Sequence, residues 1–173
     1  MFAGKIPALV ESRDLNSIKA AAELFSEKYK LRTVIVGADD LSRQPDLLDD
    51  YSVSVCVGPQ LSVTIDSQSK NLPQLLANEQ LQFGFQSSGT TGSGMLPGAI
   101  QFSVSQGLST TDALEGLAAN PAKMLSEDIN FGQLASGKDA DLVVLSGAPF
   151  EYSTKVLAVM IDGVWVYEHE EQK

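Results

Sequence analysis

The chain has 173 residues, of which 43% are hydrophobic and 20% charged, and its 22 acidic and 12 basic side chains give a formal net charge of −10. A chain of this length buries about 70% of its unfolded surface, and its composition lies far from that of disordered proteins. We therefore expect a globular core. The negative charge repels phosphate backbones and anionic membrane surfaces at long range, which excludes nucleic acid and membranes as expected partners.

The first residues and the cysteine content restrict the class of protein further. Residues 1–7 contain no long apolar core with a cleavage site, and no apolar run approaches the ~20 residues of a membrane span, so we expect neither a signal peptide nor a transmembrane segment in this chain. The sequence assigns no compartment. Cys56 is the only cysteine, which excludes an internal disulfide and a multi-cysteine metal site. Its position in an apolar run predicts a buried, inert thiol.

Four nearly continuous apolar segments predict buried strands. They cover residues 6–11, 32–37, 53–58 and 81–86. Asp14 is a candidate N-cap for a helix, because apolar side chains then repeat at helical spacing up to Tyr29. A short helix is predicted at 45–51. Strands that alternate with helices indicate a parallel sheet covered on both faces.

The middle of the chain is predicted to be less regular before it becomes helical. Residues 60–70 form a polar loop in this interpretation, and Asn71 caps a short helix at 72–78. The Ser/Thr/Gly-rich segment 87–94 leads into an apolar helix at 95–106, which Gly107 ends. Ser109 and Asp112 resemble a capping box for the next helix.

The last part of the chain changes to a strand-like pattern. Residues 141–145, 155–161 and 164–168 are rich in Val, Ile and Leu. Asp162 and Gly163 lie between the last two segments and predict a type I′ hairpin turn, which needs positive φ at both central residues.

Four motifs in the second half of the chain carry a family resemblance. They are Leu-Ser-Thr-Thr-Asp-Ala-Leu at 108–114, Asn-Pro-Ala at 120–122, Gly-Lys-Asp-Ala-Asp-Leu-Val-Val-Leu at 137–145 and Asp-Gly-Val-Trp-Val at 162–166. The chain resembles the amidohydrolase superfamily, and its imidazolonepropionase-like branch in particular, most strongly from 108 to 167. The resemblance implies an α/β fold that is the C-terminal half of a (β/α)₈ TIM-type barrel followed by a small β-sandwich segment. Residues 1–125 would be the last four strand-helix units, and residues 126–173 the C-terminal strands of a composite sandwich domain.

The resemblance also implies a chemistry, namely hydrolysis of non-peptide C–N bonds in cyclic or linear amides by a metal-activated water. The family uses zinc or another divalent metal, held by histidines at the carboxyl ends of barrel strands, with an aspartate that takes a proton from the water. At the corresponding positions this chain has Glu11, Gly37 and Ser88, and the His-x-His pair of the first barrel strand has no counterpart. We therefore expect no metal or other cofactor in this chain and a catalytically incompetent family member, a pseudoenzyme.

Other candidate sites are weaker. The single histidine, His169, lies in a polar tail and is expected to be solvated. Glu11, Asp39, Asp40 and Ser88 could gather at one end of the sheet and hold a hard cation weakly, although solvated loop charges are the favoured interpretation.

Two further segments resemble functional motifs. The glycines of 87–94 suggest a backbone cradle for phosphate, but the segment lacks the lysine of a P-loop, and a flexible loop at the top of the barrel is favoured. Lys138 and Asp141 lie in a turn that enters a sandwich strand, so structural roles are expected for them.

The half barrel itself predicts an association. Its first and last strands would leave unpaired edges, so we expect either a homodimer or a complex with a missing N-terminal half barrel. The alternative function is a noncatalytic binding or association module, with a small polar ligand in a cleft lined by Glu11, Asp39 and residues 87–94.

Overall fold

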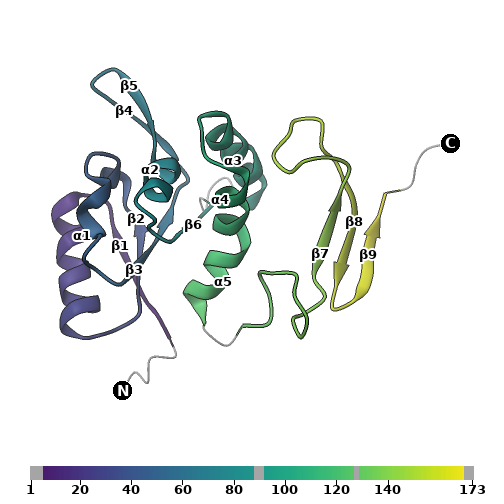
Figure 1. Cartoon of the computed structure of the whole chain (residues 1–173), viewed down its shortest axis with the longest axis horizontal. Helices are drawn as coiled ribbons and strands as arrows, with labels where there is room; N and C mark the ends of the chain where they lie inside the picture. The colour runs from purple at the N-terminus through teal and green to yellow at the C-terminus, as the bar shows by residue number, and fades with distance from the viewer. Residues whose placement is uncertain (1–5, 88–91, 127–128, 170–173) are drawn as a thin grey trace.

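The computed structural model describes residues 6–87, 92–126 and 129–169. It contains a four-stranded parallel sheet in the order β1-β2-β3-β6, formed by β1 (Ala8–Ser12), β2 (Thr33–Gly37), β3 (Val53–Val57) and β6 (Phe83–Phe85). These strands confirm the four predicted segments, with ends shifted by one or two residues. The helical regions lie at one side of a separate C-terminal sheet (Figure 1).

The first helical region follows its predicted cap. Helix α1 (Leu15–Ala21) continues as η1 (Ala22–Lys28) with wider π-type hydrogen bonding. Asp14 Oδ1 accepts a hydrogen bond from the backbone nitrogen of Ser17 at 3.0 Å, and hydrogen bonds from Ser17 hold the pKa of Asp14 below its ordinary value. A 3₁₀ turn, η3 (Pro45–Leu48), stands where a short helix was expected at 45–51, and another 3₁₀ turn, η2 (Asp39–Ser42), precedes it.

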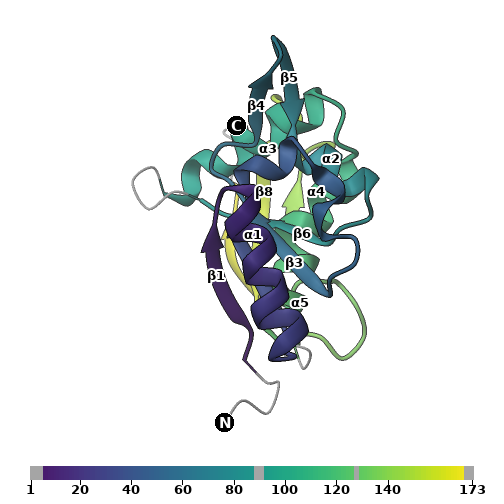
Figure 2. The same ribbon diagram turned by 90° about the vertical axis from the view of Figure 1, so that its left-hand side faces the viewer.

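The core lies on one face of the parallel sheet. Register places Ile35, Val55 and Phe83 side by side on this face, where they are buried together with Ile18 of α1 and Leu72 and Leu76 of α2 (Leu72–Asn78). Figure 2 shows α1 lying across the sheet, with β1 at its edge. Because side chains alternate along a strand, Leu9 of β1 points to the other face, where it is 60% exposed.

Two predictions about the middle of the chain are wrong. Residues 60–70 are not a loop but contain an antiparallel hairpin of β4 (Ser62–Ile65) and β5 (Gln68–Asn71). Its turn residues Asp66 and Ser67 both have positive φ, at 50° and 62°, a turn geometry for which Asn-Gly or Asp-Gly is the usual sequence signal.

The second error concerns the cap of α2. Asn71 stands at the N-cap but makes no capping bond, because its side chain bonds to Ser103. Asn71 Nδ2 donates to the Ser103 carbonyl at 2.8 Å, and Ser103 Oγ donates to Asn71 Oδ1 at 2.7 Å. This buried pair joins β5 to α3 (Leu96–Ser105), the helix predicted at 95–106.

A long helical region covers the outer edge of β6. It comprises α4 (Thr110–Leu114), η5 (Glu115–Ala119) and α5 (Asn120–Leu125). A Cβ on Gly116 would lie 2.8 Å from the Phe83 ring, so glycine permits the close approach. Asn120 Nδ2 donates to the Phe83 carbonyl at 3.0 Å. Because the Gln82 carbonyl points to β3, that of Phe83 points outward. The edge expected to be open at the last strand is therefore partly satisfied from within the chain.

The C-terminal strands form a second sheet in the order β7-β8-β9, made by β7 (Leu142–Leu145), β8 (Val156–Ile161) and β9 (Val164–Glu168). Asp162 and Gly163 have φ of 50° and 77°, which confirms the predicted positive φ at both turn positions. No residue of these strands is fully buried. Within the described residues, no helix is long and apolar enough to span a membrane.

Candidate functional site at the carboxyl ends of the strands

The carboxyl ends of β1 and β2 carry a charged cluster centred on an arginine. Arg13 Nη1 donates to Asp39 Oδ2 at 2.8 Å, and Arg13 Nη2 donates to Glu11 Oε1 at 3.1 Å. The hydrogen bond to Asp39, followed by that to Glu11, raises the pKa of Arg13. Glu11 and Asp39 therefore lie at the same end of the sheet, which the sequence analysis gave as the less favoured alternative, and a guanidinium lies between them.

Gly37 has no room for a larger side chain at this edge. Its φ is +99°, and an added Cβ would lie 3.2 Å from Arg13 Cγ and 3.3 Å from the Ser12 carbonyl oxygen. Ala38, the next residue, is itself left-handed with φ of 55°. A metal-ligating histidine at position 37 would thus require both a strained backbone and displacement of the Arg13 side chain.

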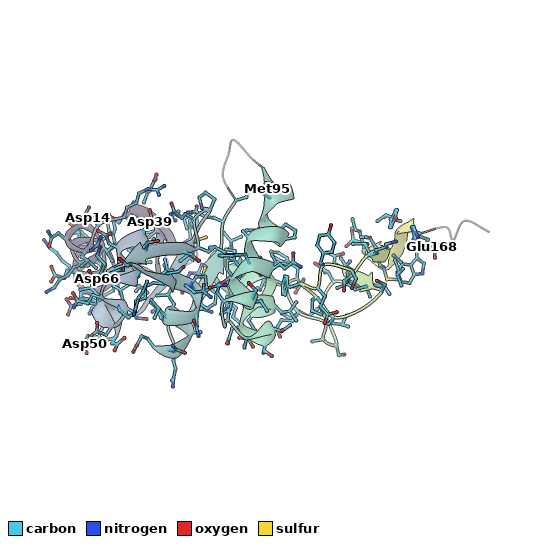
Figure 3. The ribbon with its side chains drawn as sticks, turned by 90° about the horizontal axis from the view of Figure 1, so that it is seen from above. Asp14, Asp39, Asp50, Asp66, Met95 and Glu168 are labelled. Atoms are coloured by element: carbon cyan, nitrogen blue, oxygen red, sulfur yellow. The ribbon has the colours of Figure 1, made fainter. Side chains whose placement is uncertain are left out.

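Asp40 and His169 do not join this cluster. Asp40 pairs with Arg43, with 3.5 Å between Nε and Oδ1, on an exposed surface, and Ser88 lies outside the described residues. His169 is exposed, and its backbone nitrogen donates to the Leu157 carbonyl at 2.7 Å. Figure 3 shows Asp39 and Glu168, the neighbour of His169, at opposite ends of the molecule.

The donor set does not fit a divalent metal of the amidohydrolase type. In the part of the chain that the structure describes, no group of three or more His, Cys, Asp or Glu side chains is arranged to hold a metal ion. At the strand ends both carboxylates bond to the single Arg13 guanidinium, and Gly37 has no side-chain ligand atom. Zinc sites need several preorganised nitrogen, sulfur or oxygen donors around one point, and the described residues at the strand ends do not provide such a set.

The other predicted motifs have structural contacts. Lys138 Nζ donates to the Ile129 carbonyl, and Asp141 Oδ1 accepts from the Asp162 backbone nitrogen at 2.8 Å. These bonds hold the turns around β7. Residues 88–91 of the proposed phosphate cradle lie outside the described residues. Cys56 is half-buried rather than fully buried, and burial raises the pKa of its thiol.

Two cavities lie away from the charged cluster. The larger, about 750 Å³, is lined by residues at the amino ends of the strands, including Thr33 and Val53. The second, about 360 Å³, lies between the end of α2 and the α4–α5 region and includes Gln82 and Asn120. Neither is lined by Glu11 or Asp39. The sequence did not indicate the larger cavity, because its residues come from separated turns.

Comparison with known proteins gives the class of this fold. The model of the amidohydrolase family matches residues 16–166. The chain therefore belongs to the amidohydrolase family. A comparison with curated proteins found no match.

Solved structures agree with this membership. An amidohydrolase from Thermotoga maritima MSB8 matches with a TM-score of 0.79 and 26% identity over 94% of this chain. A further amidohydrolase matches with a TM-score of 0.65 and 16% identity over 94% of the chain. A β-aspartyl dipeptidase from Fervidobacterium islandicum AW-1, solved with a β-Asp-Leu dipeptide, matches with a TM-score of 0.52 and 15% identity over 79% of the chain. The last two show similarity of fold alone.

These structures are much longer than this chain. The chain covers 44% of the Thermotoga amidohydrolase, 45% of the second amidohydrolase and 39% of the dipeptidase. The mixed α/β fold with its parallel sheet is consistent with part of an amidohydrolase barrel.

Proposed function

We propose that this chain is a noncatalytic member of the amidohydrolase family. In this proposal residues 1–125 form the C-terminal half of a barrel, and residues 126–173 form strands of a composite sandwich. The order of four parallel strands followed by a separate antiparallel sheet supports this division.

The proposed absence of catalysis rests on the contacts of Arg13. The Arg13 guanidinium bonds to both carboxylates at the carboxyl ends of the strands, with distances of 2.8 and 3.1 Å, and its aliphatic part packs where a side chain at position 37 would begin. In this family the hydrolytic water is activated by a metal at this end of the barrel. A metal ion bound by these carboxylates would have to compete with the guanidinium for their oxygens.

Metal content and hydrolysis together test the proposal. The protein is purified from zinc-supplemented medium, and its zinc-to-protein ratio is measured beside its turnover of β-Asp-Leu dipeptide and of a cyclic amide. We expect substoichiometric zinc and no turnover that chelation removes. Stoichiometric zinc with hydrolysis that is lost on chelation would contradict the proposal.

We also propose that the chain works in association, either as a homodimer or with a complementary half barrel. Ile6 and Leu9 near the open β1 edge are 68% and 60% exposed, and Val164 and Val166 of β9 are 63% and 57% exposed. Apolar surface of this extent on both sheets favours a covering partner.

A further inference from the structure

A large concave surface lies at the amino ends of the strands. Its volume of about 750 Å³ lies within the ~300–1,000 Å³ range of small-molecule sites. It is bounded by the turn between η1 and β2, by the start of β3 and by the end of α5. The charged cluster of Glu11, Arg13 and Asp39 lies at the carboxyl ends of β1 and β2, which is the opposite end of the sheet. The cavity is therefore a separate site.

The charges that line this cavity are opposite to those of the chain as a whole. The chain has 22 acidic and 12 basic side chains, yet among the described residues the lining contains Lys30, Arg32 and Lys123 and no carboxylate. The net charge of −10 opposes the approach of an anion from a distance, so binding would depend on these nearby cations. Lys30 and Lys123 are both exposed, so their attraction for an anion is weakened by water and decreases as salt is added.

Two of these cations are available to a ligand. Neither the Lys30 nor the Lys123 side chain makes a hydrogen bond or an ion pair within the described part of the chain. Arg32 instead has a positioning role, because its Nη2 donates to the Leu125 carbonyl at 2.9 Å. This bond joins the start of β2 to the end of α5 and thereby brings the segments that carry the two lysines to one cavity.

The turn that carries Lys30 is itself fixed. Lys30 has a left-handed backbone with φ of 52°, which is uncommon for a residue with a side chain. The Leu31 backbone nitrogen donates to the Phe25 carbonyl at 2.9 Å, and that of Tyr29 donates to the Leu24 carbonyl at 3.1 Å. The position of the Lys30 backbone at the rim is thus set by bonds on both of its neighbours.

The rest of the lining is neutral. Ser52 lines the cavity together with Leu31, Val34 and Met124. Ser54 lines it too, but its Oγ already donates to Gln82 Oε1 at 2.7 Å. Hydroxyl groups can donate to phosphate oxygens, while apolar side chains favour an uncharged molecular body. We propose that this cavity binds a small molecule that carries a phosphate or similar dianionic group on a neutral body.

Calorimetric titration of the full chain at constant ionic strength tests this assignment. The probes are inorganic phosphate, phenyl phosphate and phenol. We expect saturable one-to-one binding of phenyl phosphate, weaker binding of inorganic phosphate and none of phenol. The double substitution Lys30→Gln with Lys123→Gln should weaken phenyl phosphate binding at least about tenfold, because it removes two charged donors.

Lys28→Gln is the matched control. It removes one positive charge at the end of η1, two positions before Lys30, but Lys28 does not line the cavity, so affinity should stay within about twofold of the wild-type value. If the double variant fails to fold, Lys123→Gln alone, at an exposed helical position, decides the question through the same loss of affinity. The proposal is overturned if the wild-type chain binds neither phosphate compound, if phenol binds as well as phenyl phosphate, or if Lys28→Gln loses as much affinity as the cavity variants.

Discussion

The two sheets of this protein are built from similarly apolar strands but are buried to different extents. Ile35, in the parallel sheet, is 0% exposed, whereas Ile161 at the end of β8 is 50% exposed. The parallel sheet has α1 and α2 against one face and the α4–α5 region against its β6 edge. The C-terminal sheet lies beyond these helices (Figure 1). An apolar strand therefore has residues that can be buried, but they are buried only where helices or another sheet cover the strand.

The largest effect we expect comes from a matched pair of isoleucine substitutions. Ile35→Ala should lower the free energy of unfolding by ~2–5 kcal/mol, because it leaves a cavity in the core. Ile161→Ala should change it by less than ~1 kcal/mol in the dissociated chain, because half of that side chain is already in water. Urea unfolding followed by circular dichroism measures both values, and equal losses would show that the two sheets are not packed differently.

A second substitution tests whether the α4–α5 region stabilises the parallel sheet. Asn120 is 9% exposed and bonds to the Phe83 carbonyl at the free edge of β6. Asn120→Ala should cost ~1–3 kcal/mol, because it leaves a buried carbonyl without its donor. The control Asn130→Ala removes an exposed amide and should cost less than ~0.5 kcal/mol. If both variants lose a similarly small free energy of unfolding in urea, the edge bond does not stabilise the parallel sheet.

The helix that joins the two regions offers a smaller test. Ser109 Oγ accepts from the Asp112 backbone nitrogen at 3.0 Å, which confirms the predicted cap. Ser109→Ala should destabilise the chain by ~1 kcal/mol, whereas Ser109→Asp should restore most of the loss, because aspartate is also a good N-cap. Thermal unfolding midpoints compare the two variants, and an unchanged midpoint for Ser109→Ala would argue against the cap.

The smallest effect is expected at Cys56, which lies on the less covered face of the parallel sheet. Burial raises the pKa of this thiol, so folding favours its neutral form. The contribution of the neutral thiol to the free energy of unfolding is fully present below ~8.5, the thiol pKa of the unfolded chain. This contribution is lost as pH rises through the higher thiol pKa of the folded chain. At pH 8 a disulfide reagent should react with the native protein more slowly than with the urea-unfolded chain. Equal rates would show that the half-buried thiol is freely accessible.

The sequence predicted the parallel sheet well for a physical reason. Strands such as Thr33–Gly37 and Val53–Val57 are apolar along nearly their whole length, which is typical of parallel strands beneath helices. The β4–β5 hairpin was missed because its strands are largely polar and its turn is Asp-Ser. The Asn71 cap was wrong because the same amide bonds to Ser103, a partner 32 positions away.

At the candidate site the sequence indicated the residues but not their contacts. Glu11 and Asp39 were correctly expected at the same end of the sheet, since parallel strands end together. Arg13 was missed, although it lies two positions after Glu11, and alternate residues of an extended chain share a face. That spacing was the available signal. No sequence signal indicated the cavity with Lys30 and Lys123, because this cavity depends on how α5 packs across the starts of the strands.

We expect association to cover the C-terminal sheet and the open β1 edge. Size-exclusion chromatography with light scattering tests this claim most directly. The account predicts that the chain of 18.5 kDa elutes either as a homodimer or as heterogeneous aggregates when no complementary half barrel is supplied. A stable, well-folded monomer over a wide range of protein concentration would contradict it.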